Sequence, residues 1–199
     1  MHPRIAVFID YQNCYGAARR AFHSPDAPSR CGHLSPMSLA AVLAAKGWPA
    51  HQLVYVGVYC GIADPRRDGR TASARQKQVA AWRQSSGLTV VTRPLRYPHG
   101  WPNERAQEKG IDVKLAIDAV MLAVQKAYDV AIIASCDSDL APVAEALLEL
   151  QRLRGGPGVR VVAWKGLKNR IGITGRPLTY QLIDERDYHA MQDLSDYAA

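Results

Sequence analysis

Apolar residues gather in five short runs along the chain, and these runs predict five β-strands. The runs are rich in valine and isoleucine and lie at residues 5–9, 53–59, 88–92, 130–134 and 159–164. Helical patterns lie between and after them, at residues 14–22, 38–45, 72–84, 113–127 and 140–153. Glycine or proline stands near several of these segments and marks their ends.

The alternation of strands and helices predicts an α/β fold. Most of the strand-like runs are unbroken rather than alternating, which is typical of a parallel sheet covered by helices on both faces. We therefore expect a three-layer α/β/α sandwich around a mostly parallel sheet of five to six strands. In such a sheet, ligands bind beyond the carboxyl ends of the strands, where the strand order reverses.

Length and composition indicate a single domain. The chain has 199 residues, of which 48% are hydrophobic, enough for one sizeable core. We expect the domain to span residues 1–183 and the acidic segment 184–199 to be a loosely held tail. There is no apolar run of 18 residues, and the first residues lead into a strand without a secretory pattern. These features predict a cytoplasmic protein with no membrane partner.

The four cysteines, Cys14, Cys31, Cys60 and Cys136, are widely spaced and form no CxxC pair. This spacing does not match a structural zinc site, so free thiols are expected. Three of them lie in or beside apolar runs and are interpreted as small buried hydrophobic residues.

The positive charge is concentrated in one part of the chain. The net charge is +7, and residues 66–114 contain eleven Lys or Arg against four acids, while the rest of the chain balances. A concentrated basic stretch suits a polyanion such as RNA, because each phosphate contact releases counterions. The alternative is a solvated basic face without a partner.

Basic and aromatic side chains are interleaved in this stretch, as RNA-binding surfaces require. Trp101 could equally hold its own loop against the core. The candidate nucleic-acid-binding residues are Arg66, Arg67, Arg70, Arg93, Arg96, Tyr97, Trp101, Arg105 and Lys109, with Lys165 and Lys168 just beyond the fifth strand. The loops at 24–36 and 93–110 are long, and long loops at such positions often shape substrate choice.

Acidic residues stand where strands end or helices begin. Asp10 ends the first strand with Asn13 three residues later, Asp137 and Asp139 follow the fourth strand, and Asp112 lies at a helix start. All four acids are therefore expected at the same edge of the sheet. Two purely structural interpretations stay open. Asp137 or Asp139 could be a helix N-cap, and Asp112 could complement the helix dipole.

Several carboxylates in a partly dry site repel one another unless protons or cations intervene. Oxygen ligands without His or Cys favour Mg²⁺ or Mn²⁺, which can activate water and neutralise phosphodiester charge. Asp118 lies six residues from Asp112, about 9 Å along a helix. Two readings of Asp118 stay open: a deeper acid of the same site, or the partner of a Lys or Arg.

Three motifs together resemble the NYN domains of the PIN-like nuclease superfamily, particularly the LabA-like branch. They are FIDYQN, KGIDVKLAIDAV and SCDSDLAPV, which span positions 8–143 in the family's order. The resemblance implies strand order 3-2-1-4-5 and a metal-dependent ribonuclease site with Mg²⁺ or Mn²⁺.

The resemblance also implies roles for single residues. Its implied catalytic residues are Asp10, Asn13, Asp112, Asp137 and Asp139. Of these, Asp10, Asp112 and Asp137 look like metal ligands, Asn13 a group that orients substrate or water, and Asp139 an additional ligand or supporting acid. Asp118 matches a further acid of the motif, and Lys109 is assigned to phosphate contact or to fixing a carboxylate. Tyr11 and Cys136 depart from the family, which often has glycine at both positions.

The leading hypothesis is a metal-dependent endoribonuclease that hydrolyses RNA phosphodiesters with metal-activated water and uses no organic cofactor. A non-catalytic RNA-binding or regulatory module is the alternative. A phosphatase with Asp10 as nucleophile ranks low, because that chemistry needs a second Asp two residues on, where Gln12 stands.

Overall fold

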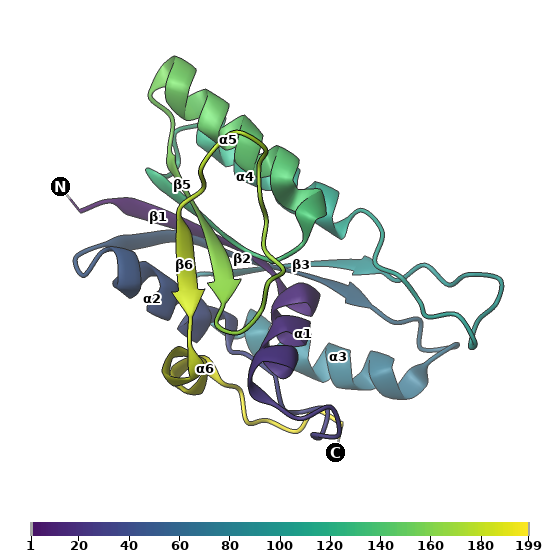
Figure 1. Ribbon diagram of the computed structural model, residues 1–199. Helices are drawn as coiled ribbons and strands as arrows, with labels where there is room; N and C mark the ends of the chain where they lie inside the picture. The colour runs from purple at the N-terminus through teal and green to yellow at the C-terminus, as the bar shows by residue number, and fades with distance from the viewer. Residues whose placement is uncertain (1, 199) are drawn as a thin grey trace.

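The computed structural model describes residues 2–198 and contains a six-stranded parallel sheet with strand order β3-β2-β1-β4-β5-β6 (Figure 1). The strands are β1 (Arg4–Asp10), β2 (Gln52–Ile62), β3 (Leu88–Pro94), β4 (Val130–Ala134), β5 (Gly158–Trp164) and β6 (Tyr180–Ile183). The predicted α/β class, the five strand positions and the strand order 3-2-1-4-5 are confirmed. The sixth strand adds to β5 at the edge.

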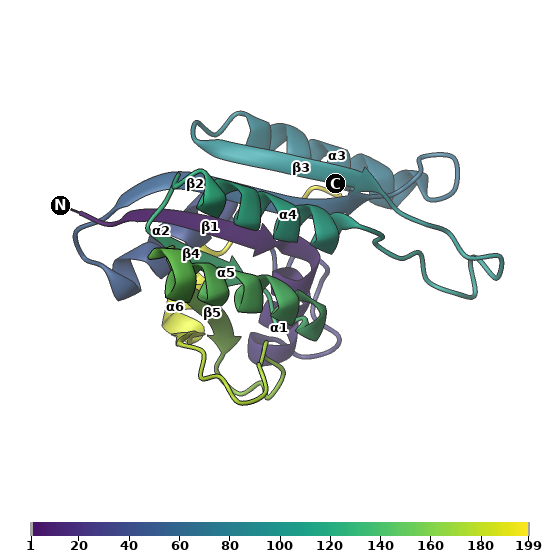
Figure 2. The ribbon, with the colours of Figure 1, turned by 90° about the horizontal axis from the view of Figure 1, so that it is seen from above.

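Helices cover both faces of the sheet, as Figures 1 and 2 show. One face carries α1 (Tyr11–Phe22), α2 (Pro36–Gly47), α3 (Gly69–Arg83) and α6 (Glu185–Met191), and the other carries α4 (Ile111–Val124) and α5 (Ala141–Arg154). Among residues 2–198, no helix is long and apolar enough to cross a membrane.

The core consists of two apolar clusters, one on each face of the sheet. Along β1, Val7 and Ile9 face α1 and α2, whereas Ala6 and Phe8 face α4 and α5. Because β1 is buried on both faces, its sequence is an unbroken apolar run rather than an alternating one. The four cysteines are free thiols, as predicted, and Cys14, Cys60 and Cys136 are buried.

The segment after residue 184 differs from the loosely held tail expected from its charge. It forms α6, whose Asp184 and Asp187 make a reciprocal capping box at the start of the helix. Tyr188 and Met191 are fully buried in the cluster shared with α1 and α2. Their spacing of three residues puts both side chains on one helical face, and burial of that face outweighs the acidic composition.

Replacing Met191 by alanine tests whether α6 belongs to the folded domain. Removal of this buried side chain is expected to lower the free energy of unfolding by about 2–5 kcal/mol, measured by urea denaturation. The matched control is Leu194→Ala, since the Leu194 side chain is 76% exposed. Equal stability of the two variants would contradict the packing of α6.

Candidate active site

Asp10 lies at the carboxyl end of β1, where the strand leads directly into α1. Its Oδ1 accepts a hydrogen bond from the backbone N–H of Asn13 at 3.1 Å, so Asp10 also caps α1. Its Oδ2 accepts a hydrogen bond from the Ser135 hydroxyl at 2.9 Å. The residue is only 9% exposed, which makes it an ionisable group held at the boundary between core and solvent.

The end of β4 is tied to α1 by further hydrogen bonds. Parallel pairing places Ile9 of β1 opposite Ala134 of β4, so the two strands end side by side. The Asn13 side-chain oxygen accepts a hydrogen bond from the backbone N–H of Cys136 at 2.8 Å. The Cys14 thiol donates to the Ala134 carbonyl at 3.0 Å. Asn13 therefore holds the β4 end in place, a role that the sequence did not indicate.

Asp137 and Asp139 follow β4 as predicted. The Asp137 N–H donates to the Ser135 hydroxyl oxygen at 3.0 Å, and its side chain accepts from the Asp139 N–H at 3.0 Å at the start of a short 3₁₀ turn. One serine hydroxyl thus connects Asp10 to the segment that carries Asp137. The capping interpretation of Asp137 describes a real contact, and Asp139 is exposed.

Glu108 is a further acid near this site and is not among the candidate residues predicted from the sequence. Its carboxylate accepts a hydrogen bond from the backbone N–H of Gly61 at the end of β2. A Cβ at Gly61 would lie 2.8 Å from Glu108 Oε1, so glycine permits this approach. The available signal was weak, since Glu108 precedes Asp112 by four residues in a loop without regular periodicity.

The electrostatic environment links these acids. Burial raises the pKa of Asp10 to about 7, the Asn13 N–H opposes that shift, and the negative charges of Glu108 and Asp137 add to it. Burial also raises the pKa of Glu108, while the hydrogen bond from the Gly61 N–H and the positive charge of Arg75 lower it and the negative charge of Asp112 raises it. Asp112 itself is half-buried in the first turn of α4. Glu108 and Asp137 therefore each disfavour the charged form of Asp10, and Asp112 disfavours the charged form of Glu108.

The donor atoms at this edge fit a hard divalent cation. Carboxylate oxygens are what Mg²⁺ and Mn²⁺ prefer, and Mg²⁺ typically takes one or two carboxylates together with water and phosphate oxygens. No three His, Cys, Asp or Glu side chains within residues 2–198 are disposed to hold a metal ion together. A pair of acids completed by substrate oxygens therefore fits this edge better than a closed protein cage.

Asp118 has partners of its own. It forms an ion pair with Lys114 one helical turn earlier and accepts a hydrogen bond from the Tyr59 hydroxyl at 2.9 Å. The structure thus favours the second of the two readings, in which Asp118 is the partner of a basic residue. The structure does not support the other reading, in which Asp118 is a deeper acid of the same site.

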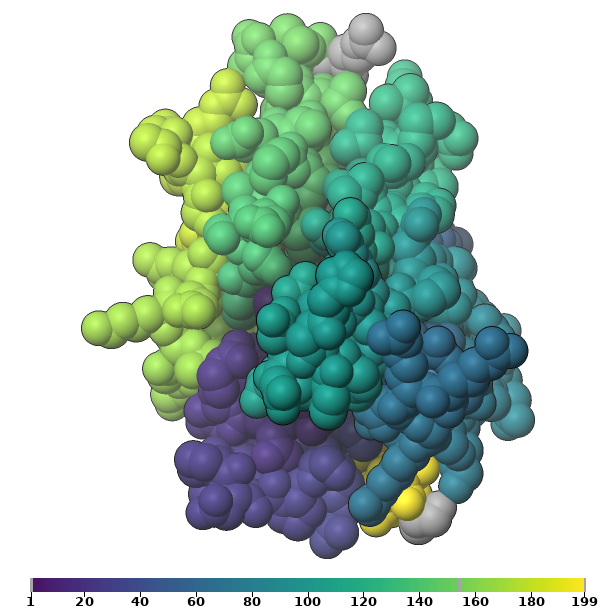
Figure 3. All heavy atoms as spheres, turned by 90° about the vertical axis from the view of Figure 1, so that its right-hand side faces the viewer, coloured from purple at the N-terminus to yellow at the C-terminus, as the bar shows by residue number. Residues whose placement is uncertain are grey.

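The candidate RNA-binding side chains lie mostly on loops, except for Arg70 in the first turn of α3 and Arg93 near the end of β3. All nine basic residues of that set are exposed, whereas Tyr97 and Trp101 are half-buried. Arg67 lies over the Tyr97 ring at 5.1 Å, and the Trp101 ring meets Tyr97 edge-on at 4.9 Å. Trp101 therefore packs within the 94–110 segment, which is drawn in teal at the centre of the face shown in Figure 3.

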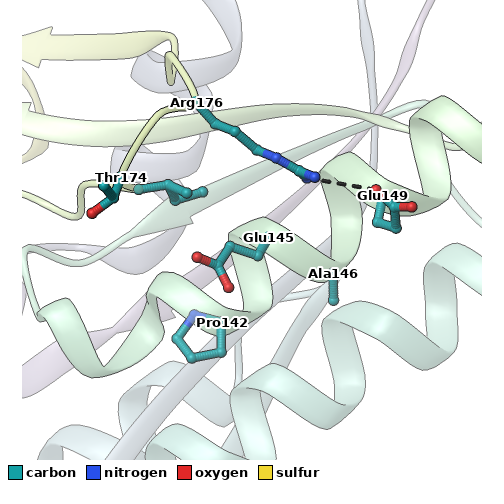
Figure 4. Close-up of a pocket in the computed structure, with 7 residues that line it drawn as sticks. Pro142, Glu145, Ala146, Glu149, Thr174 and Arg176 are labelled. Carbon is teal, nitrogen blue, oxygen red and sulfur yellow. Dashed lines mark ion pairs between the residues drawn. The ribbon is translucent and has the colours of Figure 1, made fainter.

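Lys165 and Lys168 lie on the other side of the site, directly after β5. The same loop borders an open cavity of about 530 Å³ against α5, lined by Pro142, Glu145 and Thr174 among others (Figure 4). Arg176 pairs there with Glu149 at 3.5 Å. Its lining includes none of the acids of the candidate site, which are Asp10, Glu108, Asp112 and Asp137.

Comparison with known proteins identifies the family. A search of curated proteins and a search of solved structures each found no match for this chain. The family model of the NYN domain matches residues 4–155. This segment contains β1 to β4, the acids Asp10, Glu108, Asp112 and Asp137, and the basic region 66–109. The chain belongs to the NYN domain family of the PIN-like nuclease superfamily.

Proposed function

We propose that this protein is a Mg²⁺- or Mn²⁺-dependent endoribonuclease that hydrolyses RNA phosphodiesters. The observation that supports it most directly is the junction of β1 and β4, where Ser135 connects the buried Asp10 to the segment carrying Asp137. Membership of a nuclease superfamily agrees with this chemistry. The free cysteines suit the reducing cytoplasm, which is the proposed location.

In this proposal Asp10 and Asp137 hold the cation, and substrate oxygens complete its coordination. Asp112, which the resemblance also implied as a ligand, acts with Glu108 as a nearby charge, and Asp139 is a supporting acid. A bound cation supplies an activated water and neutralises charge on the phosphodiester. Ser135 orients the Asp10 carboxylate by donating a hydrogen bond to Oδ2. Asn13 accepts a hydrogen bond from the Cys136 N–H and so holds the end of β4 beside the end of β1. The exposed Lys109 contacts substrate phosphate beside this edge.

The basic side chains hold the RNA backbone across the site. Arg93, Arg96 and Arg105 extend from the end of β3 into the 94–110 segment, and Arg66 and Arg67 lie on the neighbouring loop after β2. Their guanidinium groups match phosphate oxygens in geometry and charge. Lys165 and Lys168 offer contacts on the opposite side of the acids.

A non-catalytic RNA-binding module is the second candidate. The observation that favours it is that these basic side chains are exposed, most of them on loops. Their positions in the fold do not depend on Asp10, Glu108, Asp112 or Asp137. It predicts RNA binding without turnover at any metal concentration.

Asp10→Asn separates the two candidates. Cleavage of labelled single-stranded RNA in Mn²⁺ is expected to fall by roughly 100-fold or more, because a bound ion supplies several kcal/mol of transition-state stabilisation. The variant is expected to stay folded: the pKa of Asp10 is raised to about 7, so at pH 8 the native protein carries an unfavourable buried charge that asparagine lacks.

Asp118→Asn is the matched control, because Asp118 pairs with Lys114 and Tyr59. Cleavage by this variant is expected to match the wild type, with folding checked by circular dichroism. Cleavage that survives in Asp10→Asn would rule out the proposed enzyme.

Removal of divalent ions provides a second test. EDTA is expected to abolish cleavage, and added Mn²⁺ or Mg²⁺ to restore it, whereas RNA binding measured by fluorescence anisotropy persists in EDTA. Cleavage that continues in EDTA and disappears on further purification would identify a contaminating nuclease and contradict the proposal.

The double variant Arg93→Gln/Arg96→Gln tests the basic loop. Each lost phosphate contact is expected to reduce the slope of log K against log salt by about 0.7–1, so the double variant lowers it by about 1.4–2. Arg186→Gln on α6 is the control, since this arginine is also exposed but lies outside the 66–109 region. Equal salt slopes in both variants would remove the loop from the RNA-binding surface.

A further inference from the structure

A second cavity, of about 490 Å³, lies beside the acid cluster between α1, α3 and the C-terminal segment. Figure 3 shows the yellow C-terminal residues between the purple N-terminal region and the blue segment near α3. Its lining combines arginines, amides and aromatic rings: Gln12, Tyr15, His33, Arg70, Arg75 and Tyr197. The proposed metal ligands do not line this cavity, and Arg70 is the one candidate RNA-binding residue named above that does.

Arg75 is held rigidly in the cavity wall. Its guanidinium lies 4.9 Å above the ring of Tyr11 and donates to Gln78 Oε1 at 2.6 Å and to Gln12 Oε1 at 3.1 Å. Gln78 is 2% exposed and in turn donates to the Tyr11 hydroxyl at 2.7 Å. A guanidinium has five N–H donors, so Arg75 retains donors for a ligand in an orientation set in advance.

Three aromatic rings form a continuous series along the cavity. The ring centroids of Tyr15 and His33 are 5.3 Å apart, and those of His33 and Tyr197 are 5.8 Å apart. The tyrosine hydroxyls are anchored, that of Tyr15 to the Ser29 carbonyl and that of Tyr197 to Asp193. Burial lowers the pKa of His33 and so favours its neutral ring. These are flat surfaces of the kind on which unpaired bases stack.

The cavity is adjacent to the acids. Gln12 stands two residues after Asp10, in the first turn of α1. The positive charge of Arg75 lowers the pKa of Glu108, and the charge of Glu108 raises that of Asp10. Arg75 is therefore within electrostatic reach of the acid cluster while facing the cavity.

We propose that this cavity binds one nucleotide of single-stranded RNA next to the cleavage site, with its base on the Tyr15–His33–Tyr197 rings and its phosphate on Arg70 and Arg75. This inference rests on the proposed function for its position in the substrate. One carboxylate, Asp196, also lines the cavity, and it pairs with Arg30 at 3.9 Å. A base can enter only when it is unpaired, so the cavity selects single-stranded over duplex RNA.

The test is a binding measurement in EDTA with labelled single-stranded RNA, which requires no cleavage. Arg70→Gln is expected to weaken binding about tenfold and to lower the salt slope by about 1. Tyr197→Leu is expected to weaken it about tenfold with the slope unchanged, since it removes stacking and no charge. Both residues lie outside the buried core, so the variants are expected to fold.

Arg83→Gln is the matched control, because Arg83 is an exposed arginine in the last turn of the same helix. It lies 13 residues from Arg70, about 20 Å along α3. Binding that is equal in Arg70→Gln, Tyr197→Leu and Arg83→Gln overturns the inference, as does tighter binding by Tyr197→Leu. Equal losses on duplex RNA also overturn it.

The outcomes separate this inference from the proposed function. Wild-type cleavage in Mn²⁺ with unaltered binding by both cavity variants would leave the nuclease standing and remove the nucleotide site. Weakened binding by both variants without any cleavage by the wild type would support the nucleotide site and remove the nuclease.

Discussion

The hydrogen bond between the Ser135 hydroxyl and the buried carboxylate of Asp10 is the interaction on which the candidate site depends. It joins the ends of two adjacent parallel strands, and the Ser135 oxygen also accepts from the Asp137 N–H. Two further hydrogen bonds, one to the side-chain oxygen of Asn13 and one from the thiol of Cys14, also connect α1 to the end of β4. Asp10 thus serves the fold as a helix cap and the site as a fixed carboxylate.

This arrangement has an energetic cost that points to its use. A carboxylate that is mostly buried beside two further acids is disfavoured in its charged form, which is why the pKa of Asp10 rises. Ser135 and Asn13 donate one hydrogen bond each, and these only partly oppose the effect of burial. A cation would remove the remaining repulsion among Asp10, Glu108 and Asp137. The fold therefore places Asp10 and Asp137 at one edge of the sheet, with Glu108 acting on Asp10 there.

Much of this could be predicted from the chain, because the relevant signals are local. Unbroken apolar runs mark strands buried on two faces, and Asp10 and Asp137 stand directly at strand ends, whose common edge follows from parallel topology. What could not be predicted depends on long-range packing. Glu108 reaches Gly61 across 47 residues, and β6 is a four-residue edge strand with little signal of its own. Asp118 was open because the local ion pair with Lys114 was compatible with either reading, whereas the hydrogen bond from Tyr59 of the distant strand β2 shows only in the folded chain.

Tyr11 illustrates how a departure from the family pattern acquires meaning in three dimensions. A bulky residue where the family often has glycine suggests obstruction of the site, but Tyr11 is 1% exposed and its side chain points into the core. Its ring meets Trp82 edge-on at 4.5 Å and lies beneath Arg75, while its hydroxyl accepts from Gln78. Glycine at this position would remove the surface on which Arg75 rests. Tyr11 therefore supports Arg75 in the wall of the neighbouring cavity, so that, in the proposed nucleotide site, a residue next to Asp10 in sequence sets the position of a phosphate-binding arginine.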